Sequence, residues 1–392
     1  MSVFSPVVPI NTARPTALEF FAGIGLARIG LESSGFRVAW ANDYEADKEA
    51  LYRGHFRDEE KGNDHTFVLG DINDIDVSQL PTDASIAWAS SPCTDLSLAG
   101  NRGGIRAGES NAFWGYIRLL DQLGQENRPP VVVLENVIGL STSHGGDDLA
   151  AAIRAFNDLG YSIDVLALDA KRFLPQSRPR LFLVGAMKAP AEARSVNSAL
   201  RPEYLSWVFS DATLRTHRAE LPSPPEPRST GLSDCIEVMP GTDERWWGEA
   251  RTDAFSGSLS PIQAGRIAQL RRSNSTTYRT AYRRTRKGVA TWEVRADDIS
   301  GCLRTARGGS SKQAVVRVGA DALQVRWMTP LEYARLMGAG DYNLAGARNN
   351  QALFAFGDAV AVPAVEWLAE NYLMPMVKGQ LDVRSELVEN VQ

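Results

Sequence analysis

The stretch LEFFAGIGLARIG (residues 18–30) joins an apolar run to a helical pattern through closely spaced glycines. LEFF is typical of a short β-strand, and the residues after it have helical spacing. Gly23 and Gly25 stand at the turn, where glycine tolerates positive φ and lets a ligand approach the backbone. With Gly30 they read G-x-G-x4-G, which differs from the G-x-G-x-x-G of dinucleotide-binding folds. The stretch therefore predicts a strand–turn–helix unit with a ligand site at the turn.

The alternation of strand and helix patterns continues to residue 187. Apolar runs that end in turn residues alternate with helical patterns at 24–35, 45–56 and 146–160. Strands that alternate with helices predict an α/β fold, a mostly parallel sheet with helices on both faces. The runs expected to be strands are ALEFFAG (17–23), FRVAWAND (36–43), ASIAWASS (84–91), PPVVVLENV (129–137), SIDVLALDA (162–170) and RLFLVGA (180–186).

The alternation stops near Lys188. From there to about Val325 the sequence has no clear period and includes the proline-rich connector LPSPPEPRSTG, and helical patterns return at 329–338 and 359–374. We therefore expect one α/β domain, begun by residues 1–187 and completed by residues 326–392. A smaller domain, residues 188–325, is inserted between these two parts.

Composition places the chain among soluble globular proteins. Of 392 residues, 44% are hydrophobic and 23% charged, and no run of about 18 apolar residues predicts a membrane span. The N-terminal residues lack a basic start followed by an apolar region, so no secretory signal is expected. Three scattered cysteines are too few for a disulfide framework. A reduced, cytoplasmic setting is predicted.

The net charge of −5 hides an asymmetry. Residues 262–317 contain 13 Lys and Arg against 3 Asp and Glu, a balance of +10, so the rest of the chain is near −15. Such a segment suits a phosphate-binding surface, although a solvated basic face without a partner is the plain alternative.

Several polar residues follow predicted strands of the first domain. Asp43 ends the second strand, the GDI element contributes Asp71 and Ile72, and Cys93 follows Pro92 just beyond ASIAWASS. Ligands of open α/β sheets bind beyond the carboxyl ends of the strands. An acidic side chain at the end of the second strand suits ribose hydroxyls, and a thiol at a strand end suits chemistry better than packing.

Two further strands add a carboxyl group and two guanidinium groups. Glu135 emerges from the apolar run PPVVVL, and Arg178 and Arg180 alternate along the extended stretch that enters RLFLVGA. Side chains at i and i+2 project to the same face of an extended chain. The sequence thus predicts a nucleophile, a carboxyl group and forked donors on neighbouring strand ends.

These elements resemble, in order, the bacterial C5-cytosine DNA methyltransferases. The resemblance rests on FFAGIG, AND, GDI, SSPCTDLS, LENV, PQSRPR, TPLEYARLMG and GDAVAVP, and it covers roughly residues 1–187 and 326–372. It implies a Rossmann-like, S-adenosylmethionine-dependent methyltransferase fold. The inserted segment takes the place of the family's target-recognition domain.

The resemblance also implies a mechanism. Cys93 would add to carbon 6 of a cytosine flipped out of the duplex, Glu135 would serve N3 and the exocyclic amine, and Arg180, with Arg178 beside it, would serve O2. The Gly- and Ser-rich residues 94–110 would form a lid over the flipped base. The proposed cofactor residues are Phe21, Gly23, Gly25, Asp43, Tyr44, Asp71, Ile72, Pro92, Asp358 and Val360, and the proposed DNA contacts are Ser97, Asn101, Arg102, Arg106, Arg283, Arg284, Arg304 and Arg307.

Three positions depart from the family pattern. Asp358 stands where the family usually has Asn, Ala361 where it usually has Pro, and Thr94 where it usually has Gln after the cysteine. These changes touch contacts around the cofactor and the lid and leave the nucleophile, carboxyl group and arginines in place.

Other functions stay open at this point. A tRNA cytosine methyltransferase is disfavoured because its relatives' Cys-Phe-Thr element is absent, and a non-catalytic DNA-binding homologue because the catalytic set is complete. The glycine spacing disfavours a nicotinamide oxidoreductase, and the four histidines show no metal-ligand spacing, so no metal is expected. The implied partners are double-stranded DNA and a restriction endonuclease or phage-defence proteins, with no membrane partner, and the enzyme is expected to act as a monomer.

Overall fold

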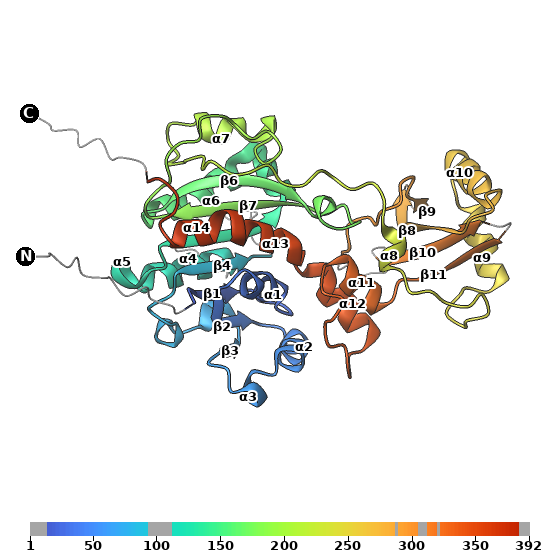
Figure 1. The fold of residues 1–392 in the computed structure, drawn as a ribbon, viewed down its shortest axis with the longest axis horizontal. Coiled ribbons are helices and arrows are strands. Elements are labelled where there is room, and N and C mark those ends of the chain that lie inside the picture. The colour runs from blue at the N-terminus through green and yellow to red at the C-terminus, as the bar shows by residue number, and fades with distance from the viewer. Residues whose placement is uncertain (1–13, 93–111, 287–288, 305–311, 320–321, 384–392) are drawn as a thin grey trace, which may run out of the picture.

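The computed structural model describes residues 14–92, 112–286, 289–304, 312–319 and 322–383. Figure 1 shows a large lobe built on one sheet and a small lobe built on another, joined by chain segments that run in both directions. Here the large lobe means the seven-stranded sheet with the helices that cover it, and the small lobe means residues 249–327.

The sheet of the large lobe confirms the predicted α/β class. Its seven strands have the order β3-β2-β1-β4-β5-β7-β6, and only β7 runs antiparallel to its neighbours. The strands are β1 (Thr16–Phe20), β2 (Arg37–Asp43), β3 (Thr66–Leu69), β4 (Ile86–Ser90), β5 (Val131–Val137), β6 (Ser162–Asp169) and β7 (Pro179–Ala186). Six of these were predicted. β3 was missed because its apolar run, Phe67 to Leu69, is only three residues long.

Helices cover both faces of this sheet, as expected from the alternating pattern (Figure 1). The N-terminal part supplies α1 (Leu26–Ser33), α2 (Ala46–Phe56), α3 (Asp58–Lys61), α4 (Ala112–Gln122), α5 (Gly124–Asn127) and α6 (Asp147–Asp158). The inserted segment adds α7 (Ser206–Ser210) and α8 (Leu232–Cys235), and α8 lies beside the small lobe (Figure 1). The C-terminal part supplies α11 (Pro330–Leu336), α12 (Asn349–Asp358), α13 (Val362–Leu368), a π-helical turn (Ala369–Leu373) and α14 (Met374–Val377).

The two ends of the chain complete one another in the large lobe. Helix α13 packs against α1, more than 300 residues earlier (Figure 1). The contact is close at Gly30, where an added Cβ would lie 2.7 Å from Cβ of Val365. Any larger side chain at position 30 would push the helices apart, so Gly30 serves packing. By length and composition residues 349–377 could cross a membrane, but 67% of their most apolar window is buried inside the protein, as in a core helix.

The small lobe corrects the expectation of an irregular insertion. Residues 277–327 form an antiparallel sheet of order β11-β10-β8-β9, covered by two helices. Its elements are α9 (Glu249–Gly257), α10 (Pro261–Arg271), β8 (Thr277–Arg286), β9 (Val289–Val294), β10 (Gln313–Gly319) and β11 (Ala322–Trp327). The strands were missed because β8, TYRTAYRRTR, carries arginine and tyrosine where an apolar alternation would mark a strand.

The small lobe has its own core and also shares one with the large lobe. Phe255, Val316 and a group of tryptophan rings fill the space between its sheet and helices. Leu303 and Val315, by contrast, belong to the cluster that contains the residues of α1 and α13. Buried apolar surface thus connects the two lobes at the point where the sheet of the small lobe meets α11.

Candidate active site at the carboxyl edge of the large sheet

The strand register brings the predicted site residues to one edge. Phe20, the last residue of β1, pairs with Asn42 of β2 on one side and with Ala89 of β4 on the other. Ser90, the last residue of β4, pairs with Glu135 of β5. Because these four strands are parallel, the residues that follow them emerge together at the carboxyl edge, where open α/β sheets bind ligands.

The turn after β1 separates a packing glycine from a ligand-facing one. Phe21, Gly23 and Gly25 all have left-handed φ angles of 55°, 57° and 77°. A Cβ at position 25 would lie within 2.9 Å of the rings of Phe56 and Tyr52, whereas one at Gly23 would meet no atom within 4 Å. Gly25 is therefore required by packing, and the open side of the turn is at Gly23.

Asp43 closes this turn from the neighbouring strand. Its carboxylate accepts hydrogen bonds from the backbone N–H groups of Gly23 (2.8 Å) and Glu45 (2.9 Å). Burial raises the pKa of Asp43, against the opposing charge of Lys48. Each oxygen has one backbone donor and keeps acceptor capacity for a further hydroxyl group.

Lys48 was not predicted, yet it forms an ion pair with one of the predicted cofactor residues, Asp358. Its Nζ lies 2.8 Å from the carboxylate of Glu45 and 3.2 Å from that of Asp358. The nearby charges of Asp43 and Asp358 raise its pKa despite its burial, which acts in the opposite direction. The acidic residue at 358, a departure from the family pattern, thus has a cationic partner. A single lysine inside α2 gives no sequence signal for this bridge.

The remaining predicted cofactor residues differ in exposure. The ring of Tyr44 is 57% exposed beside Asp43, and Asp71 caps the turn Ile72–Asp74 by accepting from the backbone N–H of Asn73 at 2.8 Å. Ile72 and Val360 are each 3% exposed and belong to the two large core clusters. Pro92 is half-buried at the end of the described segment.

Glu135 and Arg180, two of the predicted catalytic residues, form an ion pair. Nε of Arg180 donates to Oε1 of Glu135 at 2.9 Å, and both side chains are largely buried. They come from neighbouring antiparallel strands, since Val137 of β5 lies opposite Arg180 of β7. The structure therefore brings together a carboxyl group and a guanidinium group that the sequence separates by 45 positions.

Arg178 was expected to project to the same face as Arg180, but its side chain binds other parts of the chain. Its guanidinium group donates to the backbone carbonyls of Leu303 (2.6 Å), Gly357 (2.9 Å) and Ala359 (2.5 Å). The side chain is 1% exposed, and burial, together with the charge of Arg180, lowers its pKa to about 10. Arg178 is thus bound to main-chain carbonyls of two other chain segments and does not contact Glu135 through any of these bonds.

Asn136 was predicted from the LENV motif to lie on the same edge as Glu135, but no role was assigned to it. Its Nδ2 donates to the backbone carbonyl of Ser91 at 3.0 Å, and its Oδ1 accepts from the backbone N–H of Val137. It thereby fixes the chain just before Pro92 to the end of β5. Cys93 follows directly but lies outside the described residues, as do Ser97, Asn101, Arg102, Arg106 and Arg307.

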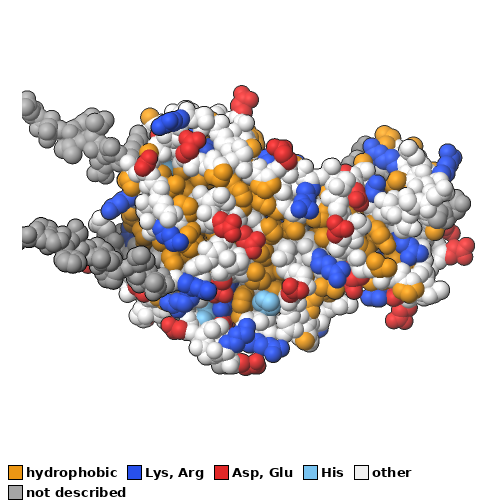
Figure 2. Space-filling model, viewed as in Figure 1, with side chains coloured by type: hydrophobic (Ala, Val, Ile, Leu, Met, Phe, Trp, Pro, Cys, Tyr) orange, Lys and Arg blue, Asp and Glu red, His pale blue; other side chains and the backbone are white. Residues whose placement is uncertain are grey.

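The predicted DNA-contacting residues that the structure describes are exposed. Arg283 and Arg284 lie in β8, the latter 3.7 Å from the carboxylate of Glu293, and Arg304 ends a described segment next to Cys302. On the face drawn in Figure 2, Lys and Arg side chains alternate with Asp and Glu over both lobes. The positive segment 262–317 therefore forms no continuous basic band on this face.

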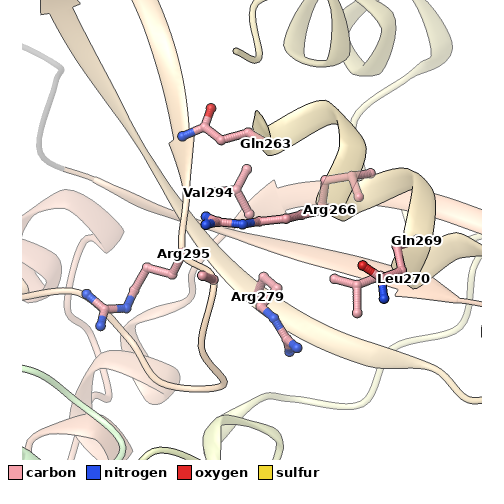
Figure 3. A pocket seen from close by; sticks show the side chains of 9 residues that line it. Gln263, Arg266, Gln269, Leu270, Arg279, Val294 and Arg295 are labelled. Carbon is pink, nitrogen blue, oxygen red and sulfur yellow. The ribbon is translucent and has the colours of Figure 1, made fainter. Parts of the chain in front are cut away.

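A cavity of about 200 Å³ lies between α10 and the strands of the small lobe. Figure 3 shows that its three arginines, Arg266, Arg279 and Arg295, point in different directions. Arg279 lies 3.4 Å from Asp298, and Arg295 forms a two-pronged pair with Asp297. The cavity is thus only partly positive, and its guanidinium groups do not converge on one ligand position.

Comparisons with known proteins identify the family of the chain. The family described as C-5 cytosine-specific DNA methylase matches residues 16–373. Type II methyltransferase M.Bsp6I of Bacillus sp. (strain RFL6) is 26% identical over 365 residues, 92% of this chain and 98% of the relative, and M.HpaII of Haemophilus parainfluenzae is 26% identical over 95% and 93%. The crystal structure of S. pombe Dnmt2 methyltransferase has a similar fold, with a TM-score of 0.61 at 18% identity over 93% of this chain and 99% of that one. The chain belongs to the C-5 cytosine-specific DNA methylase family and is an enzyme of the DNA (cytosine-5-)-methyltransferase class.

Proposed function

We propose that this enzyme transfers a methyl group from S-adenosylmethionine to carbon 5 of a flipped-out cytosine in a specific duplex DNA sequence, through a covalent bond between Cys93 and carbon 6. The observation that carries the proposal is the buried Glu135–Arg180 pair at 2.9 Å, set at the strand ends beside the segment that leads to Cys93.

The chemistry explains why these residue types are needed. Carbon 5 of cytosine is a poor nucleophile, and addition of the Cys93 thiolate to carbon 6 breaks the aromatic system and makes carbon 5 enamine-like. Negative charge then develops on the ring at N3 and O2. Glu135 interacts with N3 and the exocyclic amine, and Arg180 donates to O2. After methylation, loss of the carbon 5 proton and elimination of the thiolate restore the aromatic ring and free Cys93.

The Glu135–Arg180 pair is prepared for this task before a base enters. The guanidinium group holds the carboxyl group in place, so that little reorganisation is needed when charge develops. Asn136 fixes the end of the chain segment that leads to Pro92, because it donates to the Ser91 carbonyl. Groups fixed in this way are worth about 2.7–4 kcal/mol each in comparable charge stabilisation.

The cofactor residues fit S-adenosylmethionine. Gly23 leaves open space at the turn, Asp43 offers carboxylate oxygens to ribose hydroxyls, and the exposed ring of Tyr44 offers a stacking face for adenine. Asp71 and Ile72 bracket the adenine, and Asp358 closes the pocket from the C-terminal side. When bound, S-adenosylmethionine supplies an electrophilic methyl group.

The remaining expectations concern partners. We assign target recognition to residues 188–325, with Arg283, Arg284 and Arg304 on DNA phosphates and bases. The relatives M.Bsp6I and M.HpaII are type II methyltransferases, which supports a role beside a restriction endonuclease or in phage defence. The proposed enzyme acts in the cytoplasm as a monomer.

An assay of methyl transfer tests the proposal. Wild type, Cys93→Ala and the control Cys235→Ala would be incubated with labelled S-adenosylmethionine and unmethylated genomic DNA, and in parallel with total tRNA. A duplex containing 5-fluorocytosine, run on a denaturing gel, would trap the covalent adduct. We expect transfer to DNA and an adduct in wild type and Cys235→Ala, and neither in Cys93→Ala. Transfer to tRNA alone, or none to DNA, would refute the proposal.

A further inference from the structure

We propose that Arg178, assisted by Gln176, is a positioning residue that couples the seating of the small lobe on its target DNA to the Glu135–Arg180 pair. The inference rests on the proposed function and extends it, because it assigns to these two buried side chains the step by which correct target recognition raises the rate of methylation.

The segment that carries both residues is held directly by residues of the small lobe that follow β9. Residues 176 and 300 form a parallel bridge, in which Ser177 N–H donates to the carbonyl of Ser300 (2.9 Å) and Ser300 N–H donates to that of Pro175 (2.6 Å). The segment 175–178 runs directly into β7, where Arg180 is the second residue. A shift of residues 300–303 therefore displaces residues 175–178, and Arg180 of the active site follows two residues later in the chain.

The side chains extend this contact to a third part of the chain. Gln176 is fully buried; it accepts from the backbone N–H of Leu303 (3.2 Å) and donates to the carbonyl of Leu336 (2.6 Å). Arg178 donates to the carbonyls of Leu303 and of Gly357 and Ala359, which flank Asp358 of the proposed cofactor pocket. Three segments thus meet on two neighbouring side chains.

The charge of Arg178 makes the arrangement sensitive to position. The cation is 1% exposed, and its guanidinium group donates to backbone carbonyls and to the thiol of Cys302. A buried charge is strongly disfavoured when it loses a partner. If the small lobe moves and withdraws Leu303, Arg178 must follow it or lose a 2.6 Å bond. Either response disturbs the chain that presents Arg180.

This coupling predicts that a wrong target sequence lowers the rate of methylation as well as the affinity for DNA. A wrong sequence that binds with the small lobe displaced leaves Arg180 misplaced relative to the base. Misplacement by about 1 Å costs about 10²-fold in rate. Disruption of the coupling should therefore lower the methylation rate on the correct sequence. It should also reduce the ratio between the rates on the correct and the wrong sequence.

The test uses the full-length protein and a duplex whose target cytosine has first been mapped by bisulfite sequencing, beside a duplex altered at one neighbouring base pair. Arg178→Lys keeps the charge but loses the forked donor geometry. Arg201→Lys is the matched control, because Arg201 is 4% exposed and bonded to Asp164 and Ala219, outside the site. Gln176→Met keeps the volume and removes all three hydrogen bonds of the side chain, to Leu303, Leu336 and Met337. It replaces Arg178→Lys if that variant does not fold.

We measure the single-turnover rate, the Kd for each duplex and the pH midpoint of Cys302 alkylation, followed by mass spectrometry. For Arg178→Lys we expect a rate about 10²-fold lower on the correct duplex, a Kd within about threefold of wild type, a narrower rate ratio between the duplexes, and an altered alkylation midpoint. Arg201→Lys should match wild type in all four.

Each failure points to a different premise. A wild-type rate in Arg178→Lys, a loss confined to Kd, or an equal loss in Arg201→Lys overturns the coupling while the proposed function stands. Absence of methylation by wild type overturns the proposed function itself. In that case the alkylation midpoint, which needs no activity, still tests whether Arg178 contacts Cys302.

Discussion

The two sheets of this protein present polar side chains in opposite ways. In the seven-stranded sheet they are buried and paired, as at Asp43, Glu135 and Arg180, and they collect where parallel strands end. In the four-stranded sheet Arg283 and Arg284 are consecutive and both exposed, so that β8 shows polar side chains on both faces there. Parallel strands gather distant residues at one edge, whereas antiparallel strands spread theirs over two faces.

The difference explains why one lobe suits chemistry and the other suits an extended surface. A buried pair has fixed geometry and a strong local field, which reaction intermediates require. Exposed arginines on a twisted sheet can follow a phosphate backbone but carry no fixed base specificity. The following predictions test this division.

The largest effect is expected at the buried pair. Glu135→Gln keeps the shape and removes the carboxylate that pairs with Arg180, so we expect the methylation rate to fall by about 10²–10³-fold, with little change in DNA binding. Single-turnover methylation and a binding isotherm measure the two quantities. Glu203→Gln, at an exposed position, is the control. A loss below tenfold would show that burial of polar groups in the large lobe does not mark catalysis.

The next test is at the boundary between the lobes. Burial opposes ionisation of the Cys302 thiol, but the charges of Arg178, Arg180 and Arg304 outweigh it and lower its pKa, whereas burial raises the pKa of Cys235 to about 11. We expect iodoacetamide to alkylate Cys302 on the order of 10²-fold faster at pH 8, because the thiolate is the nucleophile. Peptide mapping measures both rates, and equal rates would contradict the assigned surroundings.

On the small lobe a smaller change is expected. Arg283→Ala combined with Arg284→Ala should weaken DNA binding by about tenfold at moderate salt and reduce the salt dependence by about one to two phosphate contacts. The rate at saturating DNA should stay near that of wild type. Binding isotherms at several salt concentrations provide the measurement. A fall in the saturated rate with unchanged binding would break the proposed division between the lobes.

The smallest effect concerns pH. Burial and the charge of Arg28 lower the pKa of His65 from 6.5 to about 4, and its Nδ1 lies 2.9 Å from the Val38 carbonyl. A lowered folded-state pKa means that the contribution to stability is present above pH 6.5 and is lost as the pH falls toward 4. We expect the free energy of unfolding to decrease by about 1–2 kcal/mol over this range, measured by urea unfolding.

The matched variant for this last test is His65→Gln, which does not titrate. Its free energy of unfolding should change less between pH 6.5 and 4 than that of wild type. An identical pH profile in both proteins would assign the acid sensitivity to other groups, such as the carboxyl groups of the large lobe.

The sequence predicted the large lobe well because its signals are local. Apolar runs, turn residues and glycines gave six of seven strands, and the rule that sites lie at carboxyl ends brought Asp43 and Glu135 to the correct edge. The family resemblance singled out Glu135 and Arg180 as site residues, but the ion pair between them was not predicted. Register between β5 and β7 then provides the contact.

What the sequence did not predict depends on contacts between distant segments. Lys48 and Asn136 act through Asp358 and the Ser91 carbonyl, and neither residue type nor spacing signals such partners. Arg178 and Arg180 look equivalent in the sequence, yet one binds backbone carbonyls and the other a carboxylate. The small sheet escaped prediction because β8 needs only a few buried positions and fills the rest with arginine and tyrosine.

The packing of α13 against α1 has a consequence for how the protein is made. At a synthesis rate of about 5–20 residues per second, a ribosome needs roughly 20–60 seconds to proceed from α1 to α13. The small sheet lies within one continuous stretch, residues 277–327, and its chain is complete earlier. Throughout that interval the face of α1 that contains Gly30 stays exposed on the nascent chain, because α13 has not yet been synthesised. The nascent protein therefore passes through a stage in which the small lobe, to which we assign target recognition, can be folded while the large lobe is still incomplete and accessible to chaperones.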